Sequence, residues 1–438
     1  MHSMKKAATD DVERIFQKSY ISHKSGKFSE AEKGYRKILK IKPEWGQPMG
    51  ALGILYLDQN RPDKAIPLFE KAAALNPPDL SACYQLGRLK QMENDHQGAI
   101  PVYQQMLEQQ PEAGLVWNNL GVAYRETGKP DDAMESFRAA VRFAPEMAEA
   151  WNNLGVALDE QGQVEQALNA YQKAIGIQPD YVSPHLNIGI MLQKLERFKE
   201  AETHYRKVLE SQPQNEIAQF MLQSIRGGDT PPDAAPVAHV RSIFNQCAQN
   251  FEAILVEKLE YKTPEHLFHM VRPYLTENME ILDLGCGTGL GALLYRPFAK
   301  SLTGVDVSEK MLEKAAEKKI YSCLEVFDIM QPWAFPVKFD LIYSSDVFVY
   351  FGDLDQIIKS AAAALAPGGK IAFSVEKLKD NSKNYELYPS GRYAHSQEYI
   401  QTCLNRHGFK PLALNSTDIR KQSGNPVKGF LIVAEKKE

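Results

Sequence analysis

A period of 34 residues runs through the first half of the chain. Prolines recur at that spacing: Pro43, Pro77, Pro111, Pro145, Pro179 and Pro213. Two further sets keep the same period, the alanines Ala31, Ala65, Ala99, Ala133, Ala167 and Ala201 and the aromatic residues Tyr35, Phe69, Tyr103, Phe137, Tyr171 and Tyr205. A period of this length is typical of solenoids, in which each repeat is one unit that packs only against its neighbours.

The pattern resembles the tetratricopeptide repeat, W-x2-L-G-x2-Y followed by Ala, Phe/Tyr and Pro. Glycine and alanine belong where two antiparallel helices approach closely, and proline ends the second helix because it lacks an N–H and clashes with the preceding turn. We therefore predict an all-α superhelix over residues 12–226, made of six 34-residue repeats and a closing helix at 216–226. The first repeat has Lys18-Ser19 in place of Leu-Gly and is expected to be a cap.

Three asparagines, Asn119, Asn153 and Asn187, occupy the same place in successive repeats. They would form a row on one face of the superhelix. Similar rows in tetratricopeptide proteins such as the O-GlcNAc transferases hold an extended peptide through their side-chain amides. Peptide binding is one interpretation of the row, and the other is that asparagine is simply common at this position. We expect a protein partner on the concave face.

Residues 227–236 (GGDTPPDAAP) contain too much glycine and proline for a regular element and are predicted to be a semi-rigid linker. From there to residue 438 the pattern alternates between strands and helices. Strands are predicted at 280–285, 302–306, 324–327, 339–344 and 370–375, and helices at 309–318 and 354–365. This alternation predicts an α/β, doubly wound, Rossmann-like domain with a parallel sheet.

Ligands of such sheets bind at the carboxyl ends of the strands. The first predicted strand leads through Asp283 into a loop with Gly285, Gly287 and Gly289, whose backbone can turn tightly and approach a ligand. The second strand ends in Asp306, where a carboxylate can accept both hydroxyls of a ribose. Asp328 follows the third strand.

Other nucleotide sites fit this loop less well. A nicotinamide or flavin site expects G-x-G-x-x-G/A, and counting from Gly285 the last position is Leu290. Counting from Gly287 it is Ala292, but that match begins too far beyond the strand. A phosphate-binding Walker loop needs GK[ST] after its glycines, which is missing here. S-adenosylmethionine accounts for the three aspartates and the glycines together.

Residues 281–290, 304–311, 328–329, 339–350 and 365–376 resemble the successive motifs of class I methyltransferases. Residues 241–267 and the pairing with repeats resemble predicted bacterial tetratricopeptide methyltransferases. The resemblance implies S-adenosylmethionine as methyl donor. It implies that the following residues bind it: Asp283, Gly285, Gly287, Gly289, Asp306, Val307, Met311, Asp328, Ile329 and Ser345.

Within that set the resemblance implies that Asp283 orients the methionine amino group and that Asp306 binds the ribose hydroxyls. Asp328 would accept from the adenine amino group. Asp346, Tyr393 and His395 are the candidate catalytic residues beside the transferred methyl. A histidine with a pKa of about 6.5 suits a general base. The alternative is that His395 packs at the start of a helix over 396–406, with Ser396 as its cap.

Residues 237–267 place Phe244, Phe251, Leu255, Leu259 and Tyr261 at near-helical spacing. As a lid, this segment would close over the site and exclude water; as the alternative, it covers one face of the sheet. Arg392 would pair either with an acidic substrate or with a surface carboxylate.

Several classes of function are disfavoured. The fourth strand is followed by SSDV, where enzymes that methylate amide or exocyclic nitrogens carry Asn/Asp-Pro-Pro-Tyr/Phe. The net charge is -4 and no basic stripe with interleaved aromatics is present, so we expect no nucleic-acid partner. The chain has no apolar run of about 18 residues, the length that would predict a membrane span. The five cysteines form no CxxC pair, which predicts no metal site and a cytoplasmic location.

The leading prediction is methyl transfer from S-adenosylmethionine to a small molecule, with the repeats serving protein–protein interaction. The alternative is a protein methyltransferase whose superhelix captures the substrate peptide. A third possibility, from another class, is an interaction scaffold that binds the cofactor without catalysis.

Overall fold

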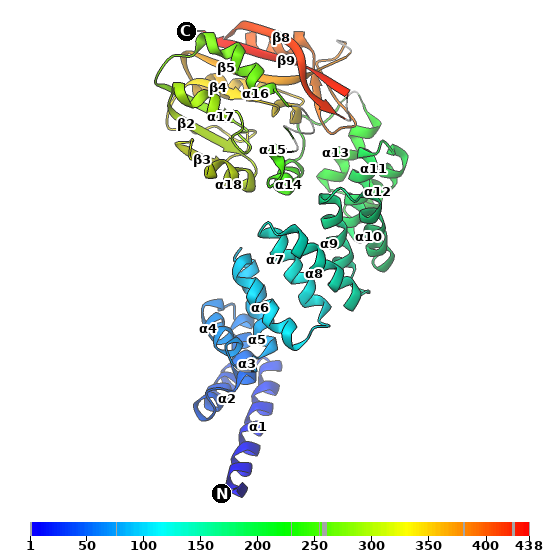
Figure 1. Ribbon diagram of the computed structural model, residues 1–438, viewed down its shortest axis with the longest axis vertical. Helices are drawn as coiled ribbons and strands as arrows, with labels where there is room; N and C mark the ends of the chain where they lie inside the picture. The colour runs from blue at the N-terminus through cyan, green and yellow to red at the C-terminus, as the bar shows by residue number, and fades with distance from the viewer. Residues whose placement is uncertain are drawn as a thin grey trace. The chain divides into compact units, whose positions relative to one another are not determined.

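The computed structural model describes residues 2–75, 77–228, 230–253, 255, 261–379, 382–422 and 425–437. The chain forms two compact units, Met1–Pro184 and His185–Glu438 (Figure 1). The division falls within the sequence of a helix of the sixth repeat, whereas the sequence places the domain boundary in the linker after residue 226.

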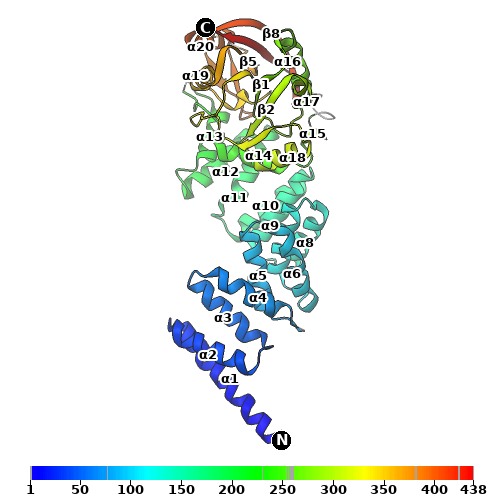
Figure 2. The same ribbon diagram turned by 90° about the vertical axis from the view of Figure 1, so that its left-hand side faces the viewer.

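The first unit consists of paired antiparallel helices, which Figure 2 shows stacked one pair after another. They are α1 (His2–Lys24), α2 (Phe28–Ile41), α3 (Gly46–Asp58), α4 (Pro62–Ala73), α5 (Leu80–Met92), α6 (His96–Gln109), α7 (Gly114–Glu126), α8 (Pro130–Phe143), α9 (Ala148–Glu160) and α10 (Val164–Ile177). Helix α1 begins before residue 12, where the predicted superhelix starts. The predicted all-α repeat architecture is otherwise confirmed.

The repeated residues have repeated contacts. A Cβ atom added to Gly121 in α7 would lie 2.6 Å from the ring of Phe137 in α8, so a larger residue there would push the two helices apart. The indole N–H of Trp117 donates to the carbonyl oxygen of Pro111 at 2.8 Å, and Trp151 repeats this bond one period later. The period of the sequence is therefore the period of helix contacts inside each repeat.

The second unit contains a mixed sheet with helices on both faces. Its helices are α11 (Val182–Lys194, from His185 on), α12 (Phe198–Ser211), α13 (Glu216–Arg226), α14 (Val237–Cys247), α15 (Phe251–Ala253), α16 (Thr263–Val271), α17 (Ala292–Tyr295), α18 (Glu309–Glu317), α19 (Asp355–Ala364) and α20 (Gln397–Arg406). Its strands are β1 (Met279–Leu284), β2 (Ala299–Asp306), β3 (Cys323–Val326), β4 (Phe339–Ser344), β5 (Leu365–Lys377), β6 (Tyr385–Leu387), β7 (Tyr393–His395), β8 (Phe409–Gln422) and β9 (Asn425–Lys436).

The sheet runs in the order β3-β2-β1-β4-β5, all parallel, which confirms the predicted doubly wound domain. Strand β5 continues to β7 and β6, and it also pairs antiparallel with β9, which pairs with β8. The sequence pattern does not predict these last four strands. They matter for the site because they carry side chains back to the end of β4.

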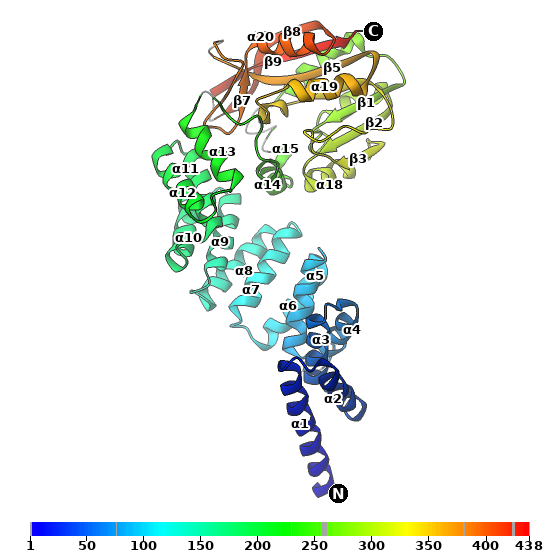
Figure 3. The ribbon, with the colours of Figure 1, turned by 180° about the vertical axis from the view of Figure 1, so that it is seen from behind.

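The faces of the sheet follow the alternation of each strand. Leu282 and Ile342 point to the face covered by α19 and α20, and Ile281 and Leu341 point to the face covered by α16 and α17. Figure 1 shows α16 in front of the sheet, and Figure 3, from behind, shows α19 across the opposite face. The two cores thus pack on opposite faces of β1 and β4 and hold these strands in place.

The last repeat packs against the sheet domain inside the second unit. Phe220 of α13, only 2% exposed, has its ring 6.3 Å from the Tyr393 ring and 6.1 Å from the His239 ring. The side-chain amide of Gln193 in α11 donates to the carbonyl oxygen of Pro389 at 2.5 Å. The closing helix is therefore part of the packing of the α/β domain.

The predicted linker is also packed onto that domain. The backbone N–H of Ala235 donates to the carbonyl oxygen of Tyr350 at 2.8 Å, and the N–H of Gly352 donates to that of Asp233 at 2.6 Å. The described part of this segment is thus held to the end of β4, and differs from the semi-rigid spacer that its composition predicts.

Candidate functional site

A cavity opens at the carboxyl ends of β1, β2 and β4, where a doubly wound sheet binds its ligands. The structure brings most of the predicted site residues into its wall: Asp283, Gly285, Gly287, Asp306, Val307, Asp328, Ile329, Ser345 and Asp346. Gly289 and Met311 are predicted donor-binding residues that do not line it. A side chain at Gly289 would collide with the Tyr321 ring, and Met311 is fully buried in α18.

Asp283, the last but one residue of β1, is a buried carboxylate between two phenols. Its Oδ2 accepts hydrogen bonds from Tyr321 at 2.7 Å and from Tyr343 at 2.6 Å. Burial raises the pKa of Asp283 to about 7, because an apolar environment disfavours its charge, although the two phenols oppose that rise. A positively charged group entering the cavity would stabilise the ionised form. Neither tyrosine was predicted, because each lies on a different loop or strand.

The glycine loop after β1 has the backbone that only glycine adopts readily. Gly285 and Gly287 have φ of +75° and +54°. A Cβ atom on Gly285 would lie 2.4 Å from Val347, whereas one on Gly287 would meet only the Phe251 ring at 3.6 Å. A side chain at Gly285 would therefore collide with Val347, whereas the missing side chain at Gly287 leaves space in the cavity.

Asp306 ends β2 and organises the same loop. Its Oδ2 accepts from the N–H of Gly287 and its Oδ1 from the N–H of Ser308, both at 2.9 Å. Burial raises the pKa of Asp306, and these backbone hydrogen bonds oppose the shift. Each carboxylate oxygen has a second lone pair, so Asp306 can still accept hydrogen bonds from a ligand in the cavity.

Asp328 follows β3 and is held in a similar way. Its Oδ1 accepts from the N–H of Met330 at 2.9 Å, and Oδ2 accepts from the side chain of Gln331 at 3.2 Å. With Asp283 and Asp306, it gives the cavity three carboxylates around the glycine loop. This set of acceptors fits a nucleoside that carries a positively charged amino-acid group, as S-adenosylmethionine does.

Asp346, after β4, belongs to a buried ion-pair network that was not predicted. Its backbone is left-handed with φ of +59°, and its N–H donates to Ser374 Oγ at 2.7 Å. Its Oδ1 accepts from Arg420 Nη1 at 2.6 Å, and Arg420 also pairs with Glu376. Glu376 lies on β5 and Arg420 on β8, so only the sheet pairing brings them to Asp346.

His395 and Tyr393 do not line the cavity. His395 is fully buried, and its Nε2 lies 3.0 Å from the carbonyl oxygen of Gly352. Burial lowers the pKa of His395 to about 4. The hydroxyl of Tyr393 donates to the carbonyl oxygen of Pro232 at 2.6 Å. The structure therefore places both residues outside the cavity wall, because the segment that carries them is strand β7, packed between β5 and β6.

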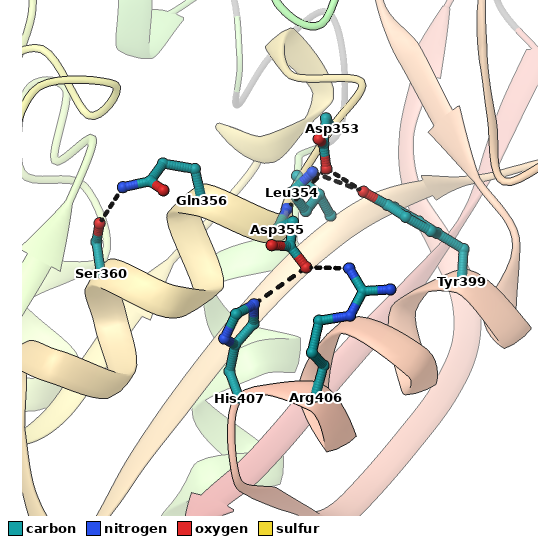
Figure 4. Close-up of polar contacts among 8 residues, drawn as sticks. All are labelled: Asp353, Leu354, Asp355, Gln356, Ser360, Tyr399, Arg406 and His407. Carbon is teal, nitrogen blue, oxygen red and sulfur yellow. Dashed lines mark hydrogen bonds and ion pairs between the residues drawn. The ribbon is translucent and has the colours of Figure 1, made fainter.

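Polar contacts join the start of α19 to α20 and the residue after it (Figure 4), and Tyr399 of this junction lies beside His395. The Tyr399 ring stacks on His395 with centroids 6.0 Å apart. Its hydroxyl donates to Asp353 Oδ1 at 2.7 Å and accepts from the N–H of Leu354 at 2.8 Å. Ser396 caps α20, as the alternative interpretation of His395 predicts.

The segment before the sheet lies over the cavity. Val240, Phe244, Phe251 and Leu255 are among its lining residues, and the Phe244 ring packs edge-on against both Phe251 and Tyr350. The segment is tied down by Ser308, whose hydroxyl donates to Asn245 at 2.6 Å. The described residues of α14 and α15 thus lie where the lid interpretation places them, whereas residues 263–267 begin α16, which covers one face of the sheet. Leu259, the fourth apolar residue of the predicted lid, lies outside the described residues.

The asparagines of the repeats are half-buried in their helices. The side-chain amide of Asn153 donates to Asn118 Oδ1 at 2.9 Å, and that of Asn118 donates to Glu149 at 3.3 Å. Asn119 and Asn153 share the first unit, and Asn187 belongs to the second. The predicted row is thus divided between two units.

Two features are absent from the described residues. None of their helices combines the length and the apolar composition that crossing a bilayer requires. In the same residues, no three or more His, Cys, Asp or Glu side chains gather closely enough to hold a metal ion.

Family models match both halves of the chain. A methyltransferase domain matches residues 256–414, and tetratricopeptide repeat models match 49–81, 84–147, 148–181 and 186–212.

Curated relatives match the second half. A ubiquinone biosynthesis O-methyltransferase of Coxiella burnetii is 30% identical over 174 residues, which cover 35% of this chain and 72% of the relative. Its counterpart in Idiomarina loihiensis is 29% identical over 198 residues, 40% of this chain and 79% of the relative. A malonyl-[acyl-carrier protein] O-methyltransferase of Acetivibrio thermocellus is 25% identical over 181 residues, which span 36% of this chain and only 62% of that relative.

Solved structures resemble each half at low identity. Magnesium protoporphyrin IX methyltransferase of Synechocystis, with bound S-adenosylmethionine, is 19% identical with a TM-score of 0.37 and covers 48% of this chain and all of its own. The tetratricopeptide protein YrrB, described as having an unusual peptide-binding site, is 20% identical with a TM-score of 0.38, over 42% of this chain and 95% of its own.

Proposed function

Because the chain belongs to the S-adenosylmethionine-dependent methyltransferases and joins their domain to tetratricopeptide repeats, we propose that it methylates a small-molecule acceptor. The observation that carries the proposal is the cavity at the ends of β1, β2 and β4, which is covered by the α14–α15 segment. A covered cavity suits a small acceptor better than an extended chain. The relatives named for ubiquinone biosynthesis support the same choice.

In this proposal each residue of the cavity has a simple task. When bound, S-adenosylmethionine supplies a methyl group already activated by its sulfonium. Asp283 would hold the ammonium of its methionine part, Asp306 the ribose hydroxyls and Asp328 the adenine amino group. Phe244 and Phe251 would exclude water from the reacting atoms. The protein then needs to align the acceptor with the methyl group rather than to provide an activated group of its own.

The protonation of Asp283 gives a pH test. We expect the affinity for S-adenosylmethionine to fall as the pH drops below about 7, because the protonated carboxyl no longer attracts the ammonium. Below the pKa, the ionised fraction falls about tenfold for each pH unit. Calorimetry between pH 5.5 and 8.5 would measure the slope. The matched variant Asp283→Asn should bind weakly with no such slope, and an equal slope in that variant would contradict the assignment.

Protein methylation is the second candidate, favoured by the half-buried Asn119 and Asn153 in neighbouring repeats. Incubation with methyl-labelled S-adenosylmethionine and cell lysate separates the two candidates, with Asp306→Ala as the blank. We expect label in the soluble small-molecule fraction. Label in precipitated protein that disappears when Asn119→Ala is combined with Asn153→Ala would establish the second candidate instead. In either case the repeats serve to bind a protein.

A further inference from the structure

Among the described residues that line the cavity there is no histidine, the side chain that most often acts as a general base, and each of the four aspartates already has a hydrogen-bond or ion-pair partner. Asp283 accepts two phenol hydrogen bonds, Asp306 two backbone N–H groups, Asp328 the N–H of Met330, and Asp346 pairs with Arg420. A hydroxyl acceptor usually needs a base to remove its proton, whereas a carboxylate acceptor is already ionised at neutral pH.

The cavity does contain a cation, Arg392, at the end formed by Asp346 and Tyr350. Its guanidinium lies over the Tyr350 ring, 5.8 Å from the ring centroid. Within the described part of the chain, no carboxylate oxygen lies within 4.0 Å of the Arg392 guanidinium. Arg420, in contrast, forms ion pairs with both Asp346 and Glu376. Burial alone would lower the pKa of Arg392. Tyr350, Asp346 and Glu376 raise this pKa by more, so its net shift is upward and the guanidinium stays charged.

The backbone around Arg392 is fixed on both sides. The N–H of Tyr388 donates to the Arg392 carbonyl oxygen at 2.9 Å, and the N–H of Gly391 donates to that of Tyr388 at 2.9 Å, which closes a tight turn. Gln193 binds Pro389 within this turn, and Gly391 lies against Phe220. The backbone that carries Arg392 is thus already in place before a ligand binds.

The segment that covers the cavity contributes apolar side chains to its lining: Val237, Val240, Phe244, Phe251 and Leu255. Of these, Phe244 packs against Tyr350, the residue whose ring lies under Arg392. A ligand that fits here has a hydrophobic body and one anionic end. The guanidinium fork matches a carboxylate through two parallel hydrogen bonds.

We propose that the acceptor is an amphipathic carboxylic acid, bound by Arg392 through its carboxylate and methylated on a carboxylate oxygen. This inference rests on the proposed methyl transfer. The lone pair of one carboxylate oxygen forms the new O–C bond to the methyl carbon as the S–C bond breaks. The electron pair of that bond stays on sulfur, so a carboxylate and a sulfonium become a neutral methyl ester and a neutral thioether. No proton is released, and therefore no base is needed.

The chemistry of the product tests the inference. Purified protein is incubated with methyl-labelled S-adenosylmethionine and a protein-free extract of small molecules, and the labelled product is treated with mild alkali. A methyl ester releases its label as volatile methanol, whereas an aryl or alkyl ether and a methylamine keep it. We expect most of the label to become volatile. Label that stays with the product would overturn the carboxylate acceptor and leave the methyltransferase assignment intact.

Arg392 is tested by Arg392→Met, which removes the charge and keeps the length of the side chain. We expect alkali-labile product to fall about 30-fold or more, since an anion left without its buried partner is held far less tightly. Arg392→Lys should retain part of the rate. The control is Arg406→Met, which removes an exposed arginine of α20 that pairs with Asp355. An equal loss in this control would overturn the role of Arg392.

Calorimetry with S-adenosylmethionine separates the possible failures. The Arg392 variants should bind the donor as the unaltered protein does, because their residue faces the acceptor end. If the unaltered protein does not bind the donor, the proposed function itself fails. If it binds the donor but labels nothing in the extract, both the proposed small-molecule function and the carboxylate acceptor are overturned.

Discussion

Replacing Asp306 by alanine should weaken S-adenosylmethionine binding by at least about 100-fold, because each buried donor left unpaired costs about 1–3 kcal/mol. The variant strands the buried N–H of Ser308 and the part-buried N–H of Gly287, besides removing the proposed acceptor for the ribose. The glycine loop loses its anchor at the same time. Isothermal calorimetry at pH 8 measures the dissociation constant.

The control for this variant is Glu309→Ala, which removes an exposed carboxylate from the first turn of α18. Glu309→Ala changes the net charge by the same amount and leaves the glycine loop in place. Its affinity for S-adenosylmethionine should therefore stay close to that of the unaltered protein. Asp306→Asn should fall between the two, since an amide has one acceptor oxygen in place of two. Equal affinity in Asp306→Ala and Glu309→Ala would remove Asp306 from the site.

The second large effect is expected at Phe220. Phe220→Ala should cost about 3–5 kcal/mol in the free energy of unfolding, which is usual for a buried phenylalanine truncated in a core. The lost contacts are those with His239 and Tyr393, on two elements of the α/β domain. We therefore expect the unfolding transition protected by S-adenosylmethionine to move to lower denaturant. Denaturation followed with and without this ligand identifies that transition.

Phe137→Ala is the matched comparison, because Phe137 is as buried as Phe220 but lies in the first unit against Gly121. It should destabilise the repeats by a similar amount and leave the transition protected by the ligand unchanged. If both variants shift the same transition, the closing helix α13 belongs with the repeats alone, and the packing of Phe220 on the domain contributes little.

The parts of the fold that the sequence predicts well are those with short-range causes. Gly121 and Phe137 face each other across one helix pair, so the close contact that requires a small residue repeats with the sequence. The donor end of the cavity also has short-range causes, because Asp283 and Asp306 each lie within the last two residues of a strand. Residues that follow buried parallel strands meet at one edge of the sheet whatever the connecting segments contain.

The acceptor end could not be predicted in the same way. Arg420 reaches Asp346 because β8 pairs with β9 and β9 pairs with β5, and no local pattern records two successive antiparallel pairings. His395 was misplaced for a related reason. Its neighbours look like a loop before a helix, but hydrogen bonds to β5 and β6 make that loop a strand and bury the ring.

The packing of α13 also bears on how such a chain could be lengthened or recombined. An inner repeat contacts only the repeats beside it, so copies could be added or lost within the first unit without altering the catalytic domain. The last repeat is different, because Gln193 and Phe220 fit the turn that carries Arg392. Exchange of repeat arrays between enzymes of this kind would therefore have to occur upstream of His185, with the final helices inherited together with the active site.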